Sequence, residues 1–123
     1  MEPHMNITVI SFGYGHDPAP AADAVYDLRP YRDPHIDPRL RHMTARDAEV
    51  QARVLATPGI DDLIDQAVTA ALTADRPTTI ATGCTGGRHR APVTAQTIAT
   101  RLQDAGQTVT LIHRDLDKDV IER

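Results

Sequence analysis

The chain has 123 residues, a formal net charge of −4 and a single cysteine, and 41% of its residues are hydrophobic while only 3% are aromatic. This length predicts one compact domain, residues 1–123, with an aliphatic core. The acidic charge argues against a non-specific nucleic-acid binder, and one cysteine excludes an internal disulfide and fits the cytoplasm. No apolar stretch approaches the roughly 20 residues that span a membrane, and residues 1–5 lack the features of a signal peptide.

Two strands and a proline-rich loop are predicted in the first third of the chain. Residues 6–12 are β-branched and alternate in part, which indicates a strand, and residues 24–28 indicate a second, shorter one. A glycine-containing turn at 13–16 follows the first strand. Residues 29–43 hold three prolines, so we expect an ordered loop without regular structure. A long loop in a small domain is often functional.

Two helices are predicted next, at 45–56 and at about 61–74. Thr44 would cap the first, with Asp47 three residues later as part of a capping box, and Pro58-Gly59 ends it. The second has an apolar stripe that would face a core. That stripe consists of Leu63, Ile64, Ala67, Val68, Ala71 and Leu72.

A strand at 78–82 leads into a glycine-rich turn and then into a helix that runs to about Ala105. The core face of this helix is predicted to consist of Ala95, Ile98, Ala99 and Leu102, with Gly106 just after its end. Residues 107–113 predict the last strand. This order of elements indicates an α/β fold: a small, Rossmann-like sandwich with a four-stranded, largely parallel sheet and helices packed on it.

Residues 83–90 read Gly-Cys-Thr-Gly-Gly-Arg-His-Arg and carry the clearest chemistry. A glycine-rich turn between a strand and a helix directs several backbone N–H groups at one point, where the helix dipole adds positive potential. Arg88 and Arg90 add two full charges. The Gly-Lys-Ser/Thr ending of a nucleotide-binding P-loop is absent. We therefore expect a site for a phosphate-like anion.

Cys84 leaves two interpretations open. Its spacing to Arg90 matches the Cys-x5-Arg loop of cysteine-dependent phosphatases, where a thiolate attacks phosphorus and the arginine holds two phosphate oxygens. Gly87 occupies the usual glycine position. Ala91, however, stands where those enzymes have a hydroxyl residue, and Gly83 stands where they have histidine. The alternative is a small buried cysteine at the end of a strand, which is the more common situation.

Further polar residues flank this turn in the predicted fold. The polar residues around His35 either form the wall of a polar pocket or belong to a solvated loop. The polar residues after the last strand should emerge at the same sheet edge as the turn. The candidate pocket residues are Asp27, Arg29, Arg32, Asp33, His35, His89, His113 and Arg114. The six histidines show no paired ligand spacing, so neither a metal nor another cofactor is expected.

Four motifs occur in order along residues 7–117. They are Ser11-Phe12-Gly13-x-Gly15, Asp27-x-Arg29 with Asp33-Pro34-His35, Gly83 to Arg90, and His113-Arg114-Asp115-Leu116. Together they resemble the C-terminal domain of the RapZ/YvcJ proteins, the RNase adapter family. The third motif is the most distinctive of the four.

The resemblance implies a regulatory domain that is not a catalyst. In that family the domain senses an amino-sugar phosphate, glucosamine-6-phosphate, and mediates self-association; enterobacterial members also bind small RNAs and contact an endoribonuclease. Carried over by motif, Thr85, Gly86 and Arg90 would hold the sugar phosphate, and His35 would close the pocket. Gly87 and Arg88 would assist.

This sequence departs from the family pattern in several places. Asp33 stands in place of the usual asparagine and Ala91 in place of serine. The basic C-terminal tail that favours RNA is replaced by residues 117–123, which hold three acidic and two basic side chains. No counterpart of the family's N-terminal nucleotide-binding domain, with its Walker motif, is present in the sequence, so ATP or GTP hydrolysis is not expected. The phosphate pocket remains the leading expectation, and the acidic charge weakens RNA as a partner.

Overall fold

The computed structural model describes residues 6–121; residues 1–5, where a signal peptide was judged absent, and residues 122–123 of the acidic tail lie outside the described part. The elements follow the predicted order. They are β1 (Asn6–Gly13), β2 (Ala24–Asp27), a 3-10 helix η1 (Pro34–Ile36), α1 (Ala48–Leu55), α2 (Ile60–Ala74), β3 (Thr78–Cys84), α3 (Arg90–Asp104) and β4 (Thr108–His113).

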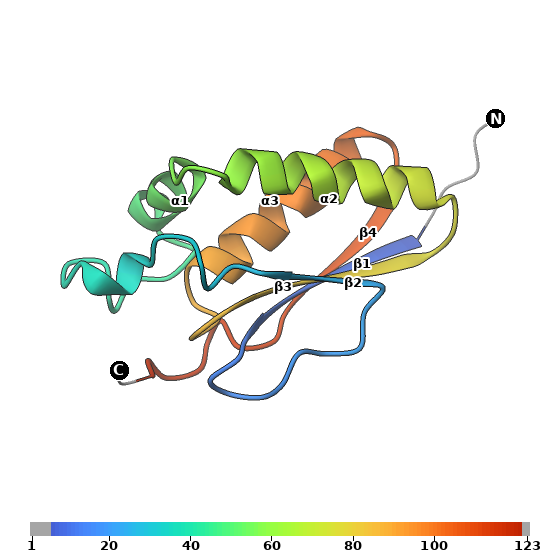
Figure 1. Cartoon of the computed structure of the whole chain (residues 1–123). Coiled ribbons are helices and arrows are strands. Elements are labelled where there is room, and N and C mark those ends of the chain that lie inside the picture. The colour runs from blue at the N-terminus through green and yellow to red at the C-terminus, as the bar shows by residue number, and fades with distance from the viewer. Residues whose placement is uncertain (1–5, 122–123) are drawn as a thin grey trace.

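The sheet has the strand order β2-β3-β1-β4, and every neighbouring pair is parallel. The predicted α/β class with a four-stranded, largely parallel sheet is therefore confirmed. Figure 1 shows the helices on one side of the sheet and the segment between β1 and β2 on the other. Because all strands run the same way, their carboxyl ends meet at one edge. There Gly13 pairs with Cys84, Ser11 with His113 and Asp27 with Gly83.

The main core lies between the sheet and helices α2 and α3, and it is aliphatic as the composition indicates. Its largest members come from alternate positions of β1 and β3 and from one face of each helix. They include Ile7, Val9, Ile80, Ile60, Ile64, Ile98 and Leu102, all at most 1% exposed. The predicted core face of α3 is buried throughout, and Gly106 follows the helix with a φ of 89°, the left-handed conformation typical of that position.

A second, smaller core lies beneath α1 and the proline-rich loop. Its buried members are Leu40, Ala45, Val50, Val54, Val93 and Leu116. This cluster joins three regions that are distant in sequence: the loop with α1, the first turns of α3, and the segment after β4. The proline-rich loop is therefore a packed part of the fold. It contains the single 3-10 turn η1, whereas the sequence predicted no regular structure there.

Several local predictions were wrong. The first helix begins at Ala48, not at residue 45, with Asp47 at its N-cap position and no side-chain cap bond. The Asp47 carboxylate accepts the Thr44 N–H, as in the predicted capping box, but this bond closes a separate turn before the helix. On α2, Leu72 is 41% exposed and does not join the core.

No helix within residues 6–121 is long and apolar enough to cross a membrane.

Candidate functional site

The three strand ends at the carboxyl edge are tied together by short hydrogen bonds. The Tyr14 N–H donates to the Cys84 carbonyl at 2.8 Å, and the Gly15 N–H donates to the Thr85 carbonyl at 2.9 Å. From beyond β4, the Asp115 carboxylate accepts the Gly13 N–H at 2.7 Å. The turn that follows β3 is therefore held in place by β1 and by the segment after β4.

Two glycines allow this close approach. A Cβ on Gly13 would lie 2.5 Å from the carbonyl carbon of Gly86, so β1 can touch the turn only without a side chain. Gly87 has a φ of 74°, in the left-handed region that favours glycine, and a Cβ there would lie 2.9 Å from the Asp115 Cβ. Gly13 and Gly87 are thus required by the shape of the backbone.

Six consecutive backbone N–H groups, those of residues 85–90, donate to no acceptor within the described part of the chain. The segment 85–89 contains only bends, and its members Gly86, Gly87 and His89 are buried. Buried amides without an acceptor are uncommon, because each one lost its hydrogen bond to water on folding. They stand at the N-terminus of α3, where the helix dipole makes the potential positive. This is the arrangement of an anion-binding turn.

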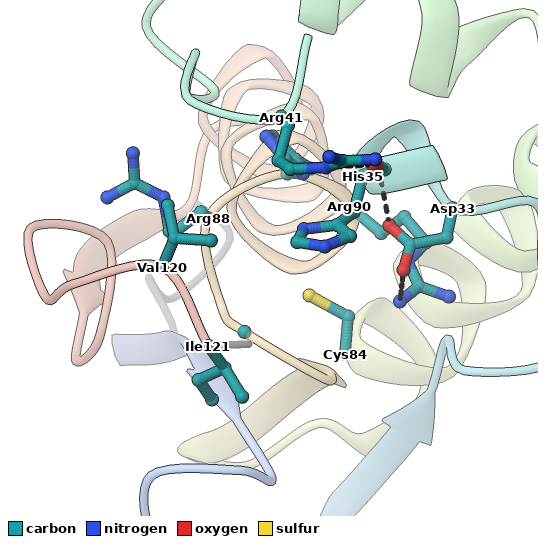
Figure 2. Close-up of a pocket in the computed structure, with 10 residues that line it drawn as sticks. Asp33, His35, Arg41, Cys84, Arg88, Arg90, Val120 and Ile121 are labelled. Atoms are coloured by element: carbon teal, nitrogen blue, oxygen red, sulfur yellow. Dashed lines mark hydrogen bonds and ion pairs between the residues drawn. The ribbon is translucent and has the colours of Figure 1, made fainter. Parts of the chain in front are cut away.

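A narrow pocket opens above this turn, and Figure 2 shows its lining. The space inside is at most about that of one water molecule. Its walls come from the proline-rich loop, the turn, the start of α3 and the segment after β4. The lining residues are Asp33, His35, Arg41, Cys84, Gly86, Arg88, His89, Arg90, Val120 and Ile121.

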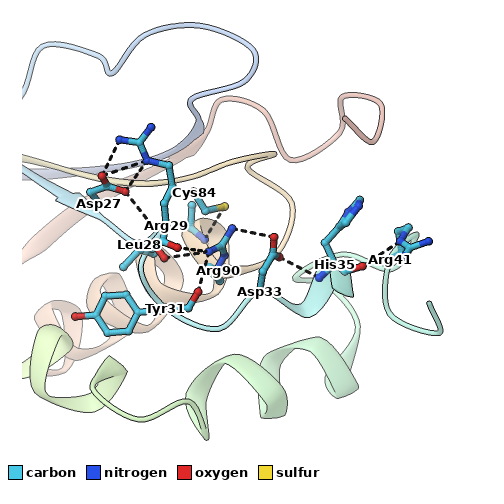
Figure 3. A network of polar contacts seen from close by, with 10 residues as sticks. Asp27, Leu28, Arg29, Tyr31, Asp33, His35, Arg41, Cys84 and Arg90 are labelled. Atoms are coloured by element: carbon cyan, nitrogen blue, oxygen red, sulfur yellow. Dashed lines mark hydrogen bonds and ion pairs between the residues drawn. The ribbon is translucent and has the colours of Figure 1, made fainter. Parts of the chain in front are cut away.

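Arg90 is the most constrained cation of the pocket and is only 3% exposed. Its Nη1 donates to three carbonyl oxygens of the loop after β2, those of Leu28, Arg29 and Tyr31, at 2.9–3.1 Å (Figure 3). Its Nη2 forms an ion pair with Asp33 at 3.2 Å. Its buried Nε has no hydrogen-bond partner among the described residues. Arg90 therefore holds the proline-rich loop against α3, and one of its N–H groups has no partner among the described residues.

Cys84 is 2% exposed and belongs to the main core, as expected of a structural cysteine. It also contributes to the pocket lining, and its Sγ accepts the N–H of Ala91, in the first turn of α3, at 3.4 Å. β3 extends through this residue, two positions further than predicted, so the glycine-rich turn begins at Thr85. Both interpretations of the cysteine remain compatible with this position.

His89 and Arg88 connect the turn to the segments around it. His89 Nε2 lies 2.7 Å from the Met43 carbonyl, which can only accept, so we assign the proton to Nε2. Burial lowers the pKa of His89 below its usual 6.5 and keeps the ring neutral. Arg88 donates to the Lys118 carbonyl at 2.7 Å and to the His42 carbonyl at 3.2 Å.

Other candidates from the sequence lie at the same edge but outside the pocket lining. Arg114 donates to the carbonyls of Gly13, Asp17 and Pro18 and thereby secures the loop after β1. His113 pairs with the Ser11 hydroxyl at 2.6 Å. Asp27 and Arg29 form a solvent-exposed ion pair, and the Arg29 guanidinium stacks on the Tyr14 ring. Arg32 lies on a separate open hollow beside Arg53.

Of the phosphate-binding residues named from the sequence, the pocket brings together Gly86, Arg88, Arg90 and His35. Thr85 and Gly87 shape the turn without lining the pocket. The sequence reasoning missed three lining residues: Arg41, Val120 and Ile121. Arg41 could have been found from its place in the same loop as His35, whose carbonyl it binds at 3.0 Å. The two apolar residues belong to a tail whose fold-back has no local sequence signal.

The parallel α/β sheet defines a Rossmann-like domain, and a small polar pocket lies at its carboxyl edge beside amides that have no acceptor among the described residues. The sequence matches the family described as the RapZ C-terminal domain over residues 5–117. The chain belongs to this family, as its motifs suggested.

Full-length relatives support this assignment. The chain is 40% identical to a nucleotide-binding protein of Mycolicibacterium vanbaalenii over 124 residues, which cover 94% of this chain and 39% of the relative. It is 42% identical to a nucleotide-binding protein of Rhodospirillum rubrum, covering 93% of this chain and 38% of the relative. A protein of the same description from Parafrankia is 40% identical, with 94% and 43% covered. The chain thus spans about two fifths of these relatives.

Proposed function

We propose that this domain is a regulatory binding module that holds the phosphate group of a small molecule, an amino-sugar phosphate, in the pocket above residues 85–90. The observation that carries the proposal is the run of six unpaired amides at the N-terminus of α3. A phosphate has enough acceptor oxygens to satisfy several of them at once, and its negative charge is favoured at a helix N-terminus. The family resemblance supplies the amino-sugar part of the proposal.

The buried Nε of Arg90 adds independent support. This N–H has no acceptor among the described residues, it belongs to a side chain that is 3% exposed, and that side chain lines the pocket. An unpaired guanidinium N–H in a buried site is costly unless an acceptor can reach it. A phosphate oxygen would fill this position with a charge-assisted hydrogen bond.

The narrowness of the pocket sets a condition on binding. A sugar phosphate is far larger than a water molecule, so the ligand must displace part of the wall. The segment with Val120 and Ile121 is the side most readily moved, because residues 114–121 form no helix or strand. Ile121 lines the pocket and packs on Gly15, since a Cβ on Gly15 would lie 2.3 Å from the Ile121 Cδ1. We expect this segment to open when the ligand enters.

Calorimetry tests the proposal with glucosamine-6-phosphate, glucose-6-phosphate, unphosphorylated glucosamine and inorganic phosphate. A nucleoside monophosphate belongs in the series because the relatives carry the description nucleotide-binding. Arg90→Lys should weaken binding by about 10-fold or more, since lysine cannot form the fork that holds two oxygens. The matched control is Arg101→Lys, on the same helix but in a surface ion pair with Asp65. If no phosphorylated compound binds better than inorganic phosphate, the proposal is wrong.

The cysteine phosphatase is the second candidate, favoured by the Ala91 N–H that points at the Cys84 sulfur. A backbone N–H at a helix start stabilises a thiolate, the attacking form in such enzymes. Turnover of an aryl phosphate that disappears in Cys84→Ser would support this function. Turnover that survives the substitution, or no turnover at all, would exclude it.

A further inference from the structure

The ion pair between Arg90 and Asp33 occupies the part of the guanidinium that a phosphate would use. In arginine, Nε–H and one Nη2–H point from the same edge of the planar group and form a fork for two oxygens. Here Nη1, on the other edge, is committed to three loop carbonyls. Nη2 is 3.2 Å from the Asp33 carboxylate, and Nε has no partner among the described residues. The phosphate-binding fork of Arg90 is thus half occupied by a carboxylate of the same chain.

We propose that Asp33 is an internal competitor for the anion: its carboxylate must leave the Arg90 fork before a phosphate can occupy it, and this competition sets the affinity of the site. The inference rests on the proposed phosphate-binding function and concerns how that site is controlled. Two negative groups cannot share one fork without repulsion, and Arg90 is buried, where water screens that repulsion weakly. Asp33 itself is 19% exposed in its side chain, so it can turn outward into water.

Displacing Asp33 would change the hydrogen bonds of the proline-rich loop. Its second carboxylate oxygen accepts the His35 N–H at 3.0 Å and caps the 3-10 turn η1. The His35 carbonyl in turn accepts from Arg41. Figures 2 and 3 show this series of contacts running from Arg90 through Asp33 to the opposite wall of the pocket. Anion binding and the conformation of residues 33–41 are therefore coupled through one carboxylate.

The first experiment compares inorganic phosphate binding to the wild-type chain, Asp33→Asn and Asp37→Asn by calorimetry. Asparagine keeps an oxygen that can accept the His35 N–H but removes the charge on the fork. We expect Asp33→Asn to bind phosphate about 10-fold more tightly, the effect of removing one like charge beside the bound anion. Asp37→Asn removes the same charge from the same loop, where it pairs with Arg53, and should bind within about twofold of wild type.

Three outcomes would overturn the inference in different ways. Equal affinity of wild type and Asp33→Asn would refute the competition and leave phosphate binding standing. An equal gain in Asp37→Asn would show a general effect of net charge. Failure of all three proteins to bind phosphate would refute the competition, because phosphate would then not occupy the fork even without the Asp33 charge, whereas the proposed function is tested by the sugar phosphates.

A second measurement uses the unaltered chain and does not depend on how the variants fold. In a phosphate titration followed by NMR, the amide signals of Gly86 and His35 should move together and give the same dissociation constant. Movement of the Gly86 signal alone would place phosphate on the turn without displacement of Asp33 and would contradict the inference.

Discussion

Replacing Arg90 by alanine should lower the stability of the fold, which the loss of a residue that only contacts a ligand would not do. The substitution removes a guanidinium that is 3% exposed and leaves the carbonyls of Leu28, Arg29 and Tyr31 without their donor. Asp33 loses its ion-pair partner at the same time. Removing one partner of a buried charged network costs about 3–5 kcal/mol, because desolvated groups remain unpaired. A domain of this size has a total stability on the order of 5–15 kcal/mol, so the loss is a large fraction.

Urea denaturation followed by circular dichroism measures this effect. We expect the free energy of unfolding of Arg90→Ala to fall by about 3–5 kcal/mol with an unchanged slope against urea. Arg29→Ala is the matched control: it removes an arginine from the same neighbourhood whose contacts with Asp27 and Tyr14 are exposed, and the free energy of unfolding should fall by less than about 1 kcal/mol. A decrease below about 1 kcal/mol in Arg90→Ala would refute the reasoning, because the loop carbonyls would then have found other donors. Ligand binding is therefore better tested with Arg90→Lys than with alanine.

Two further predictions concern the turn and its neighbours. Gly13→Ala should destabilise the domain by at least about 2 kcal/mol and weaken phosphate binding, since its Cβ would lie 2.5 Å from the Gly86 backbone. The control Gly106→Ala has open space around it and should cost only about 1 kcal/mol, because of its φ of 89°. Equal losses of stability in urea denaturation would contradict the steric argument. Burial lowers the pKa of His89, so the unfolded chain binds its proton more readily and stability should fall as the pH drops below about 6.5. His89→Gln should flatten this decline in melts between about pH 7.5 and 5, while the part due to His113, whose pKa burial also lowers, remains; an unchanged profile would show that His89 does not contribute.

Local patterns predicted most of the secondary structure, because each helix and strand buries one face of a periodic sequence. β1, α2 and α3 were all found in this way. The predicted burial of Leu72 was wrong, because the apolar stripe of α2 is wider than the part of the helix that packs on the core. The start of α1 was misplaced because Asp47 could either complete a capping box or begin the helix itself. Propensity does not distinguish the two.

The candidate site was predictable where it depends on the local backbone and unpredictable where it depends on distant contacts. The octapeptide indicated an anion-binding turn, and the structure has a turn there whose amides find no acceptor within residues 6–121. The partners of Arg90 are about 60 residues away and could not be read from spacing. The tail that places Val120 and Ile121 over the pocket follows from the burial of Leu116 in the second core, which is a tertiary event.

The proposed anion site is made of backbone N–H groups, which has a consequence for how its sequence could change. Most side chains could vary around such a surface without altering its chemistry, because each residue presents the same donor. The positions that tolerate no substitution would be glycines that do not touch the ligand but let the backbone adopt its shape. Gly13 is one, and Gly83 is another, since a Cβ there would lie 2.3 Å from the Phe12 ring. Changes in ligand preference would then arise in the pocket walls, through residues such as Asp33 and Ile121, while the floor stays constant.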